Sequence, residues 1–194
     1  MFPNSNMTGA TVEAVLDEIM KGLKTAQYTI TPDWITAEDG TALTKAVDSP
    51  AGVGFAQISN KSQVIKWEAN ATPNDIVAHF TLPQDLNDAK DIVVHLLGCP
   101  AAASPANTPV FTIEAYFDVA GVATSADTNC GGESGEFAAS TNIQEKTLKL
   151  AAADVPASPS ALTLVLHPKD GECSDVDFYL HGIWLEGTRS HLTS

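Results

Sequence analysis

Histidine side chains are the groups of this chain best suited to bind a metal ion, and their spacing tests that role. A metal site built on β-strands favours two histidines separated by a single residue, with a glutamate and a third histidine later in the chain. No two histidines here have that spacing. We therefore expect structural or surface histidines, and no bound metal, at His79, His95, His167, His181 and His191.

Three cysteines, Cys99, Cys130 and Cys173, lie far apart in the sequence, and none belongs to a C-x-x-C pair. A structural zinc site is therefore not predicted. A cysteine nucleophile needs a histidine partner and a lowered thiol pKa, and no motif indicates either. The odd count favours reduced thiols, with Cys130 as the most exposed, and a bridge between Cys130 and Cys173 is an open alternative.

Other catalytic motifs are absent from the sequence. It contains no G-x-S-x-G turn for a serine nucleophile and no glycine-rich phosphate loop with its lysine. Pairs of carboxylates suited to sugar cleavage occur by chance in a chain with 24 acidic residues, so they do not indicate a glycosidase. We expect no enzymatic activity and no cofactor.

The three tryptophans, Trp34, Trp67 and Trp184, have two interpretations. They can be flat platforms on which sugar rings stack, as in carbohydrate-binding β-sandwiches. They can also anchor the core or a subunit interface, where large amphipathic rings contribute most. We favour the second interpretation, because each tryptophan has apolar strand residues as neighbours rather than a polar aromatic cluster.

The charge of the chain limits its partners. The formal net charge is −14, from 24 acidic and 10 basic residues, so nucleic acid and anionic membrane surfaces are not expected as partners. No apolar run approaches the roughly 18–20 residues that span a membrane. The first residues lack the basic start and the apolar block of a secretory signal, so synthesis in the cytoplasm is expected.

A helical pattern precedes the part of the chain in which apolar and polar residues alternate. Apolar residues at positions 12, 15, 16, 19 and 23 share one face of a helix, with acidic residues early and lysines late, as the helix dipole favours. We therefore divide the chain into an arm with an amphipathic helix (residues 1–27) and a β domain (residues 28–194). The helix either packs on that domain or docks on a neighbouring subunit through Leu16, Ile19 and Leu23.

Alternating apolar and polar residues, with turn residues between them, predict the strands of the β domain. Residues 28–35 form a first strand or an extended arm, and residues 121–140 form a long exposed loop. About eight strands at this spacing predict an all-β fold, an antiparallel jelly-roll β-sandwich. The eight clearest strands span residues 53–59, 63–68, 75–82, 91–98, 110–119, 143–150, 161–167 and 175–189.

The last of these strands alternates most clearly. Phe178 and Leu180 lie on one side and Tyr179 lies on the other. Gly182 interrupts the alternation, which marks either a bulge or a close approach of another backbone, and Trp184 then continues the more polar side. Large side chains on both faces predict a central strand of the sandwich.

Four features between Leu82 and Glu186 occur together. They are a strand that ends at Leu82-Pro83, an Asp-rich turn at residues 85–88, an apolar strand at residues 92–97 and a last strand through residues 180–186. This arrangement resembles the jelly-roll cement or head-decoration proteins of tailed bacteriophages, and it covers the chain from Trp67 to its C-terminus. The last strand of that family usually continues into an aromatic residue, whereas this chain has Gly187.

The resemblance implies a non-enzymatic structural protein of a phage virion. Such a protein forms homotrimers on the capsid surface and joins neighbouring copies of the major capsid protein, after synthesis in the host cytoplasm. The resemblance also implies that Phe178 and Leu180 serve the core, while Tyr179, Ile183 or Trp184 faces a neighbouring subunit. The expected interface residues are Leu16, Ile19, Leu23, Tyr28, Trp34, Tyr179 and Trp184.

An alternative function stays open beside the capsid role. A carbohydrate-binding β-sandwich on a virion head or fibre has the same fold and also lacks catalytic residues. In that function the tryptophans stack on sugar rings of the host surface. A small β-sandwich enzyme is the third and weakest hypothesis.

Overall fold

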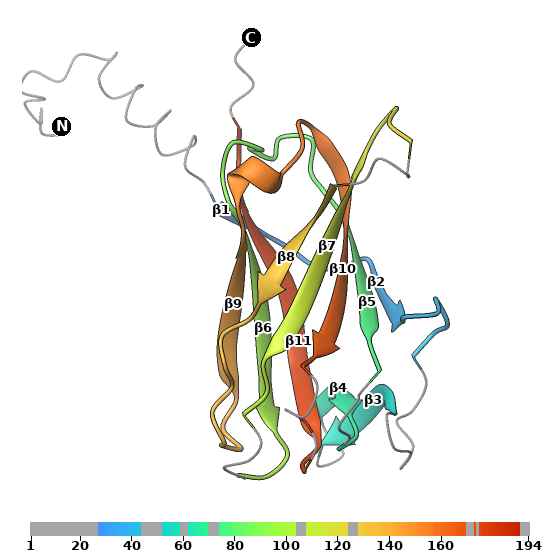
Figure 1. Ribbon diagram of the computed structural model, residues 1–194, viewed down its shortest axis with the longest axis vertical. Coiled ribbons are helices and arrows are strands. Elements are labelled where there is room, and N and C mark those ends of the chain that lie inside the picture. Colours follow the sequence, from blue (N-terminus) through green and yellow to red (C-terminus); the bar gives the residue numbers. More distant parts are fainter. Residues whose placement is uncertain are drawn as a thin grey trace, which may run out of the picture.

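Eleven β-strands in two antiparallel sheets make up most of the described chain in the computed structural model of this protein (Figure 1). The structure describes residues 27–43, 52–58, 62–69, 74–103, 108–123, 128–169, 173 and 175–190. Within these residues, helical structure is limited to a 3-10 turn at Ala152–Asp154, and no helix is long and apolar enough to cross a membrane. The amphipathic helix predicted before residue 27 lies outside the described residues.

Side chains alternate between the core and the surface along most of the strands. In β10, for example, Leu162 and Leu164 are buried, whereas Thr163 between them is partly exposed. The strands are β1 (Gln27–Ile30), β2 (Trp34–Ala37), β3 (Val53–Ile58), β4 (Ser62–Trp67), β5 (Ile76–Thr81), β6 (Ile92–Pro100), β7 (Phe111–Val119), β8 (Thr128–Glu133), β9 (Gln144–Leu150), β10 (Pro159–Pro168) and β11 (Phe178–Thr188).

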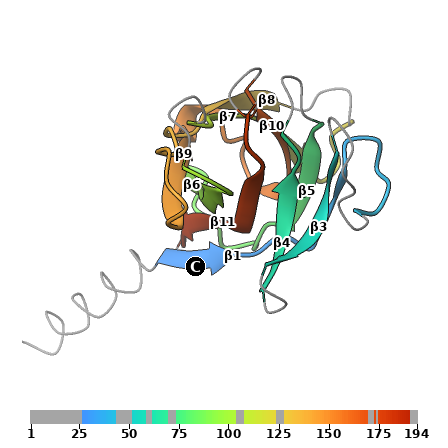
Figure 2. The same ribbon diagram turned by 90° about the horizontal axis from the view of Figure 1, so that it is seen from below.

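Eight of these strands, β4 to β11, have the order of a jelly roll. One sheet contains β4-β11-β6-β9 and the other contains β5-β10-β7-β8, and all their pairings are antiparallel. β3 extends the first sheet beside β4, β2 extends the second beside β5, and β1 pairs with the end of β11. Seen along the strands, the two sheets form layers that enclose the core (Figure 2). The predicted antiparallel jelly-roll β-sandwich is confirmed.

The prediction of a long exposed loop at residues 121–140 is wrong in two places. Thr128–Glu133 forms β8, which pairs with β7 at the edge of the five-stranded sheet. Phe137 is fully buried and contacts the rings of Phe111 and Phe178, because the chain turns inward after β8. The sequence TNCGGE does not alternate and contains two glycines, so no local pattern indicates this strand.

Gly131 explains why β8 needs glycine despite being a strand. A Cβ at this position would lie 2.0 Å from the carbonyl oxygen of Ile113, and the backbone has φ of +154°. Only glycine fits such a close approach of two backbones in this conformation. The residue that obscures the strand in the sequence is therefore required by its pairing with β7.

The stretch predicted as a first strand or arm, residues 28–35, contributes to two strands in different sheets. β1 pairs with β11 in the six-stranded sheet, and β2 pairs with β5 in the five-stranded sheet. Residues 31–33 carry the chain between the sheets. Pro32 lies in this crossing, where the missing N–H of proline costs no ladder hydrogen bond.

Four aromatic rings pack together within the core. Adjacent ring centroids in this cluster lie between 4.9 and 6.4 Å apart. The indole N–H of Trp67 donates a hydrogen bond of 2.8 Å to the carbonyl oxygen of Asn74, so its polar atom is satisfied within the core. The predicted role of Trp67 as a core anchor is confirmed. The cluster consists of Trp67, Phe111, Phe137 and Phe178.

The closing strand β11 is the central strand of its sheet, as predicted. It pairs with β6 along one edge and with β4 and then β1 along the other. Its register with β6 shifts between Leu180 and Gly182, so a bulge is present there, one of the two features predicted for Gly182. Phe178 and Leu180 lie in the core as predicted. Ile183 is buried in the core too, so its predicted alternative position at a subunit interface is wrong.

Gly98→Ala is expected to destabilise the fold through a clash with β11. A Cβ at Gly98 would lie 2.5 Å from the Phe178 ring and 2.7 Å from the carbonyl oxygen of Tyr179. Such overpacking lowers the free energy of unfolding by about 1–3 kcal/mol, which urea unfolding measures. Gly182→Ala is the matched control, because the nearest atoms to its Cβ lie 3.6 Å away. An equal loss of stability in both variants would contradict this prediction.

A largely buried ion network fixes the start of β11 against β4. The Lys66 ammonium lies 2.6 Å from a Glu68 oxygen and 2.9 Å from an Asp177 oxygen. Burial alone lowers the pKa of Lys66, but hydrogen bonds to the two carboxylates more than offset it, so this pKa lies above its usual value. Burial raises the pKa of Asp177, but the bonds from Lys66 and from the Ala69 N–H hold it below its usual value.

The lowered pKa of Asp177 predicts a loss of stability in acid. A carboxylate of this kind stabilises the fold above the ordinary aspartate pKa of about 3.9, and the contribution is lost as the pH falls through the folded-state pKa. We expect Asp177→Asn to lower the free energy of unfolding at neutral pH, and its difference from the unmodified chain to shrink below about pH 4. Urea unfolding at a series of pH values measures this difference.

The control for this pH dependence is Asp175→Asn, at an exposed position two residues away. It removes the same charge without touching the Lys66 network, so we expect little change in stability at any pH. A difference between Asp177→Asn and the unmodified chain that stays constant with pH would contradict the prediction.

Candidate functional site

The outer face of the five-stranded sheet carries a row of aromatic and polar side chains. Trp34 in β2 pairs with His79 in β5. His79 also pairs with Thr163 in β10, and Thr163 pairs with Tyr116 in β7, so the four residues form one row across the sheet. These residues point outward, because their neighbours along β5, β10 and β7 are buried in the core. Adjacent strands lie about 4.8 Å apart, so this row spans roughly 14 Å.

Trp34 is an aromatic platform that is supported from one side. Its ring stacks on the His79 ring, with centroids 4.8 Å apart and planes 6° from parallel. Trp34 is nevertheless 47% exposed, which places it among the most exposed large apolar side chains of the described residues. The stacked histidine covers one face of the indole, and the exposed part of the ring is open to a ligand.

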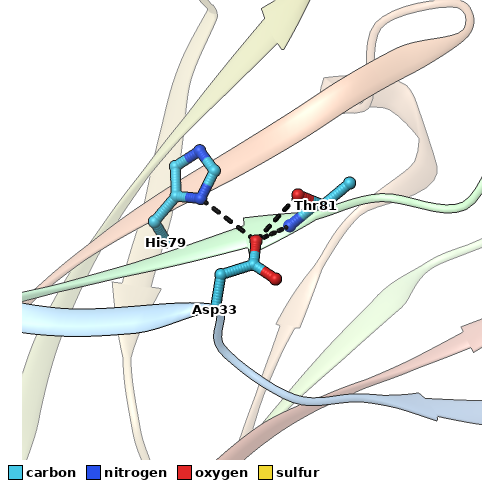
Figure 3. A network of polar contacts seen from close by, with 3 residues as sticks. All are labelled: Asp33, His79 and Thr81. Atoms are coloured by element: carbon cyan, nitrogen blue, oxygen red, sulfur yellow. Dashed lines mark hydrogen bonds and ion pairs between the residues drawn. The ribbon is translucent and has the colours of Figure 1, made fainter.

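Asp33 holds His79, whose ring stacks on Trp34, in place (Figure 3). Its Oδ2 accepts hydrogen bonds of 2.7 Å from both the N–H and the hydroxyl of Thr81, and it lies 3.3 Å from His79 Nδ1. The bond from the Thr81 hydroxyl is the main cause that lowers the pKa of the Asp33 carboxyl, and His79 acts in the same direction. Asp33 therefore stays a carboxylate at neutral pH and orients the imidazole under Trp34.

A groove of about 500 Å³ lies on the same face of the sheet. Val77 and Val165 are paired in register on β5 and β10, and they supply its apolar surface. Tyr116 belongs both to the row and to the groove, so the two features are continuous. The groove is lined by Glu38, Asp75, Val77, Thr112, Glu114, Tyr116, Val165 and His167.

Polar side chains around the groove hold each other in position. The Tyr116 hydroxyl donates a hydrogen bond of 2.5 Å to Glu114 Oε2. This bond is the main cause that raises the pKa of the phenol, because it favours the neutral form. The imidazole of His167 contacts the Asp75 carboxylate through Nδ1. Each carboxylate has further lone pairs, so these groups can still accept hydrogen bonds from a ligand.

The face as a whole is suited to bind a flat molecule that carries hydroxyl groups. An open aromatic ring packs on the apolar face of such a ligand, and carboxylates fixed beside it accept hydrogen bonds from the hydroxyls. Trp34 and Tyr116 lie at the two ends of the row, with the polar Thr163 between them. The contacts therefore favour an extended ligand that runs across the strands.

The outer face of the six-stranded sheet carries a second stacked pair. Trp184 stacks on His95, with centroids 5.0 Å apart and planes 9° from parallel. His95 Nδ1 lies 2.6 Å from Glu145 Oε1, and its Nε2 lies 3.8 Å from Glu186 Oε2. Trp184 is only partly exposed, whereas Trp34 is exposed, so this second pair offers less open ring surface.

The structure separates the interface residues predicted from the sequence. Trp34 lies on the outer face of the five-stranded sheet, whereas Tyr179 and Trp184 share the outer face of β11 in the other sheet. Tyr28 belongs to β1, which pairs with the end of β11. Their interface roles stay predictions. The remaining predicted residues lie outside the described residues and are Leu16, Ile19 and Leu23.

Sequence reasoning missed most residues of the row and the groove. The alternation of β7 does place Glu114 and Tyr116 on the side opposite its buried residues, so a signal for an outward position existed. No local pattern shows that Tyr116 lies in the same row across the sheet as Trp34, because about 80 residues of sequence separate their strands. Only the register of four strands brings the two rings into one row.

Cysteine chemistry is not supported by the geometry. Cys99, Cys130 and Cys173 are reduced thiols, so the alternative bridge between Cys130 and Cys173 is not formed. Cys99 Sγ lies 3.8 Å from His181 Nε2. Burial raises the pKa of the Cys99 thiol and lowers the pKa of His181, which disfavours a thiolate–imidazolium pair. Across the described part of the chain, no group of three or more His, Cys, Asp or Glu side chains is arranged to hold a metal.

Comparisons with known proteins relate the chain to others through its fold. No protein-family model matches the sequence, and the search of curated proteins found no match. The CBM22-2 xylan-binding domain from Paenibacillus barcinonensis has a TM-score of 0.50 at 12% identity, over 83% of this chain and 99% of that one. The family 30 carbohydrate-binding module of a Clostridium thermocellum cellulosomal cellulase has a TM-score of 0.47 at 11% identity, over 87% and 99%.

A phage protein is also among the structural neighbours. The enzymatically active domain of tailspike protein 4 from bacteriophage CBA120 has a TM-score of 0.42 at 9% identity. The match covers 82% of this chain and 19% of the tailspike chain, so this chain spans about a fifth of that length. Identities this low relate the proteins by the β-sandwich fold alone. No family match supports the resemblance to phage cement proteins, which stays a prediction.

Proposed function

We propose that this chain is a glycan-binding β-sandwich that holds a sugar chain along the outer face of its five-stranded sheet. The observation that carries the proposal is the open ring of Trp34, which is stacked on His79 and lies in one row with Tyr116 beside the groove. Sugar rings combine an apolar face with many hydroxyls, and this surface offers aromatic rings and fixed polar groups together. A xylan-binding domain has the same fold, which is consistent with the proposal.

The spacing of the contacts favours an oligosaccharide over a single sugar. The row from Trp34 to Tyr116 crosses four adjacent strands, roughly 14 Å at about 4.8 Å per strand step. A single sugar ring reaches one of the two aromatic side chains, whereas a chain of several rings reaches both. The groove beside Tyr116 gives such a chain further apolar contact at Val77 and Val165.

Binding to oligosaccharides of increasing length tests this proposal. The purified protein is screened on a glycan array, and the ligands that bind are measured by calorimetry as a length series. We expect the affinity to rise with each added sugar until the ligand spans the row, and then to level off. A protein that binds no glycan, or that binds single sugars as tightly as long oligosaccharides, would contradict the proposal.

A structural role in a phage head is the second proposed function. Tyr179 and Trp184 lie together on the outer face of the six-stranded sheet, so they can contact another subunit without covering the groove on the opposite sheet. In this role the protein is a homotrimer on the surface of the virion and joins neighbouring major capsid proteins. Light scattering that gives a monomer, together with no binding to expanded capsids, would rule this role out.

A further inference from the structure

The groove on the five-stranded sheet has a charge that favours one class of glycan. Three carboxylates line it, those of Glu38, Asp75 and Glu114. Among its described lining residues, basic character is limited to the imidazole of His167, which contacts Asp75. The carboxylates therefore outnumber the basic group even when the imidazole is protonated.

Most charges on the surrounding elements are negative too. Asp33 precedes β2, Asp118 is on the outward side of β7, and Glu133 ends β8. Lys169, just after β10, lies 3.1 Å from Glu133 and so offsets that carboxylate rather than those of the groove. The whole chain has a net charge of −14. Screening at physiological salt weakens charges over about 8 Å, so the carboxylates that line the groove act most strongly on a ligand there and favour a negative potential.

We infer that the groove prefers glycans that carry protonated amino groups, such as chains of glucosamine, over neutral and acidic glycans. The inference rests on the proposed glycan-binding function. An ammonium group on the sugar is attracted by Glu38, Asp75 and Glu114, whereas a uronic acid would place a like charge against them. The Trp34 platform contributes in the same direction, because an aromatic face attracts a cation.

Oligosaccharides that differ in the charge of each sugar unit test the charge preference. Glucosamine oligomers and N-acetylglucosamine oligomers of the same length and linkage differ at the amine, and galacturonic acid oligomers supply the acidic case. We expect the glucosamine oligomer to bind at least about threefold more tightly than its acetylated form at a pH that protonates the amine. Added salt should reduce this advantage, and the acidic oligomer should bind most weakly.

Variants that remove one charge locate the effect in the groove. Glu38→Gln and Glu114→Gln are each expected to reduce the preference for the glucosamine oligomer by roughly twofold to threefold. In the second variant the amide oxygen still accepts the hydrogen bond from the Tyr116 hydroxyl. Glu145→Gln removes the same charge on the outer face of the opposite sheet, so it is the matched control and should leave the preference unchanged.

The outcomes separate this inference from the function on which it rests. Equal affinity for the two matched oligomers, or tighter binding of the acidic oligomer, would overturn the charge preference and leave glycan binding intact. An equal change in Glu114→Gln and Glu145→Gln would attribute the preference to the net charge and overturn the role of the groove. Failure to bind any oligosaccharide, neutral ones included, would remove the proposed function itself.

Discussion

Trp34→Ala is expected to lower the affinity for a bound glycan by at least about tenfold, which corresponds to about 1.4 kcal/mol of binding free energy. The substitution removes the open ring and leaves His79 without the indole that stacks on it. Because Trp34 is 47% exposed on the edge strand β2, we expect the free energy of unfolding to change by less than about 1 kcal/mol. Calorimetry with the best ligand of the array, together with urea unfolding, measures both quantities.

Trp184→Ala is the matched control for this substitution. It removes the other outward tryptophan that stacks on a histidine, but from the opposite sheet. We expect it to leave glycan affinity unchanged. If Trp184→Ala abolishes binding and Trp34→Ala does not, the glycan site is on the six-stranded sheet and the proposed groove is wrong.

Trp34→Phe refines the same prediction. A smaller aromatic ring still offers a flat face on the same strand, so part of the affinity should be retained. An affinity equal to that of Trp34→Ala would show that a flat ring is not what the ligand recognises. The glycan would then depend on the indole N–H or on the full size of the ring.

Phe178→Ala is expected to lower the free energy of unfolding by about 3–5 kcal/mol. The ring is fully buried and lies at the centre of the aromatic cluster, with centroids 4.9 Å from Phe137 and 5.1 Å from Phe111. Its removal loses the burial of the ring and leaves a cavity between the two sheets, because strands fixed by their hydrogen bonds relax only in part. Urea unfolding measures the loss. The slope of the free energy of unfolding against urea concentration should stay unchanged.

Two further variants show whether this loss comes from the cavity. Ile143→Ala truncates an exposed apolar residue and is expected to change stability by no more than about 0.5 kcal/mol. Gly98→Ala in the Phe178→Ala background should cost less than in the unmodified chain, because its closest clash is with the Phe178 ring. Strictly additive losses for the pair would contradict a shared contact between the two positions.

Most of the strands were predictable from the sequence because their signal is local. Side chains on a strand point alternately to its two faces, so an apolar residue at every second position identifies both the strand and its inner side. This pattern correctly placed Phe178 and Leu180 on one face of β11 and Tyr179 on the other, and the structure shows that the face of Phe178 and Leu180 is the buried one. The interruption at Gly182 coincides with a bulge, one of the two features that a glycine at this place indicates. The same pattern failed for β8, whose glycines are dictated by the close approach of Gly131 to Ile113.

The candidate site was not predictable in the same way. Trp34 was a prominent residue in the sequence, but its neighbours along the chain suggested a core or interface anchor, as is true of Trp67. The ring that supports it, His79, comes from a strand more than forty residues later, and Tyr116 comes from a third strand. Asp33 also acts through a distant partner, since its main hydrogen bonds come from Thr81.

Local sequence accounts for most of the strands and for the face of each strand on which apolar residues lie, because both follow from a repeat of two residues along the chain. It does not specify which outward side chains lie in the same row across the sheet. That choice depends on the register between strands, which is set by the packing of two whole sheets and not by any local spacing. The row of Trp34, His79 and Tyr116 forms only when the strands pair in this register, and so does the acidic groove beside it.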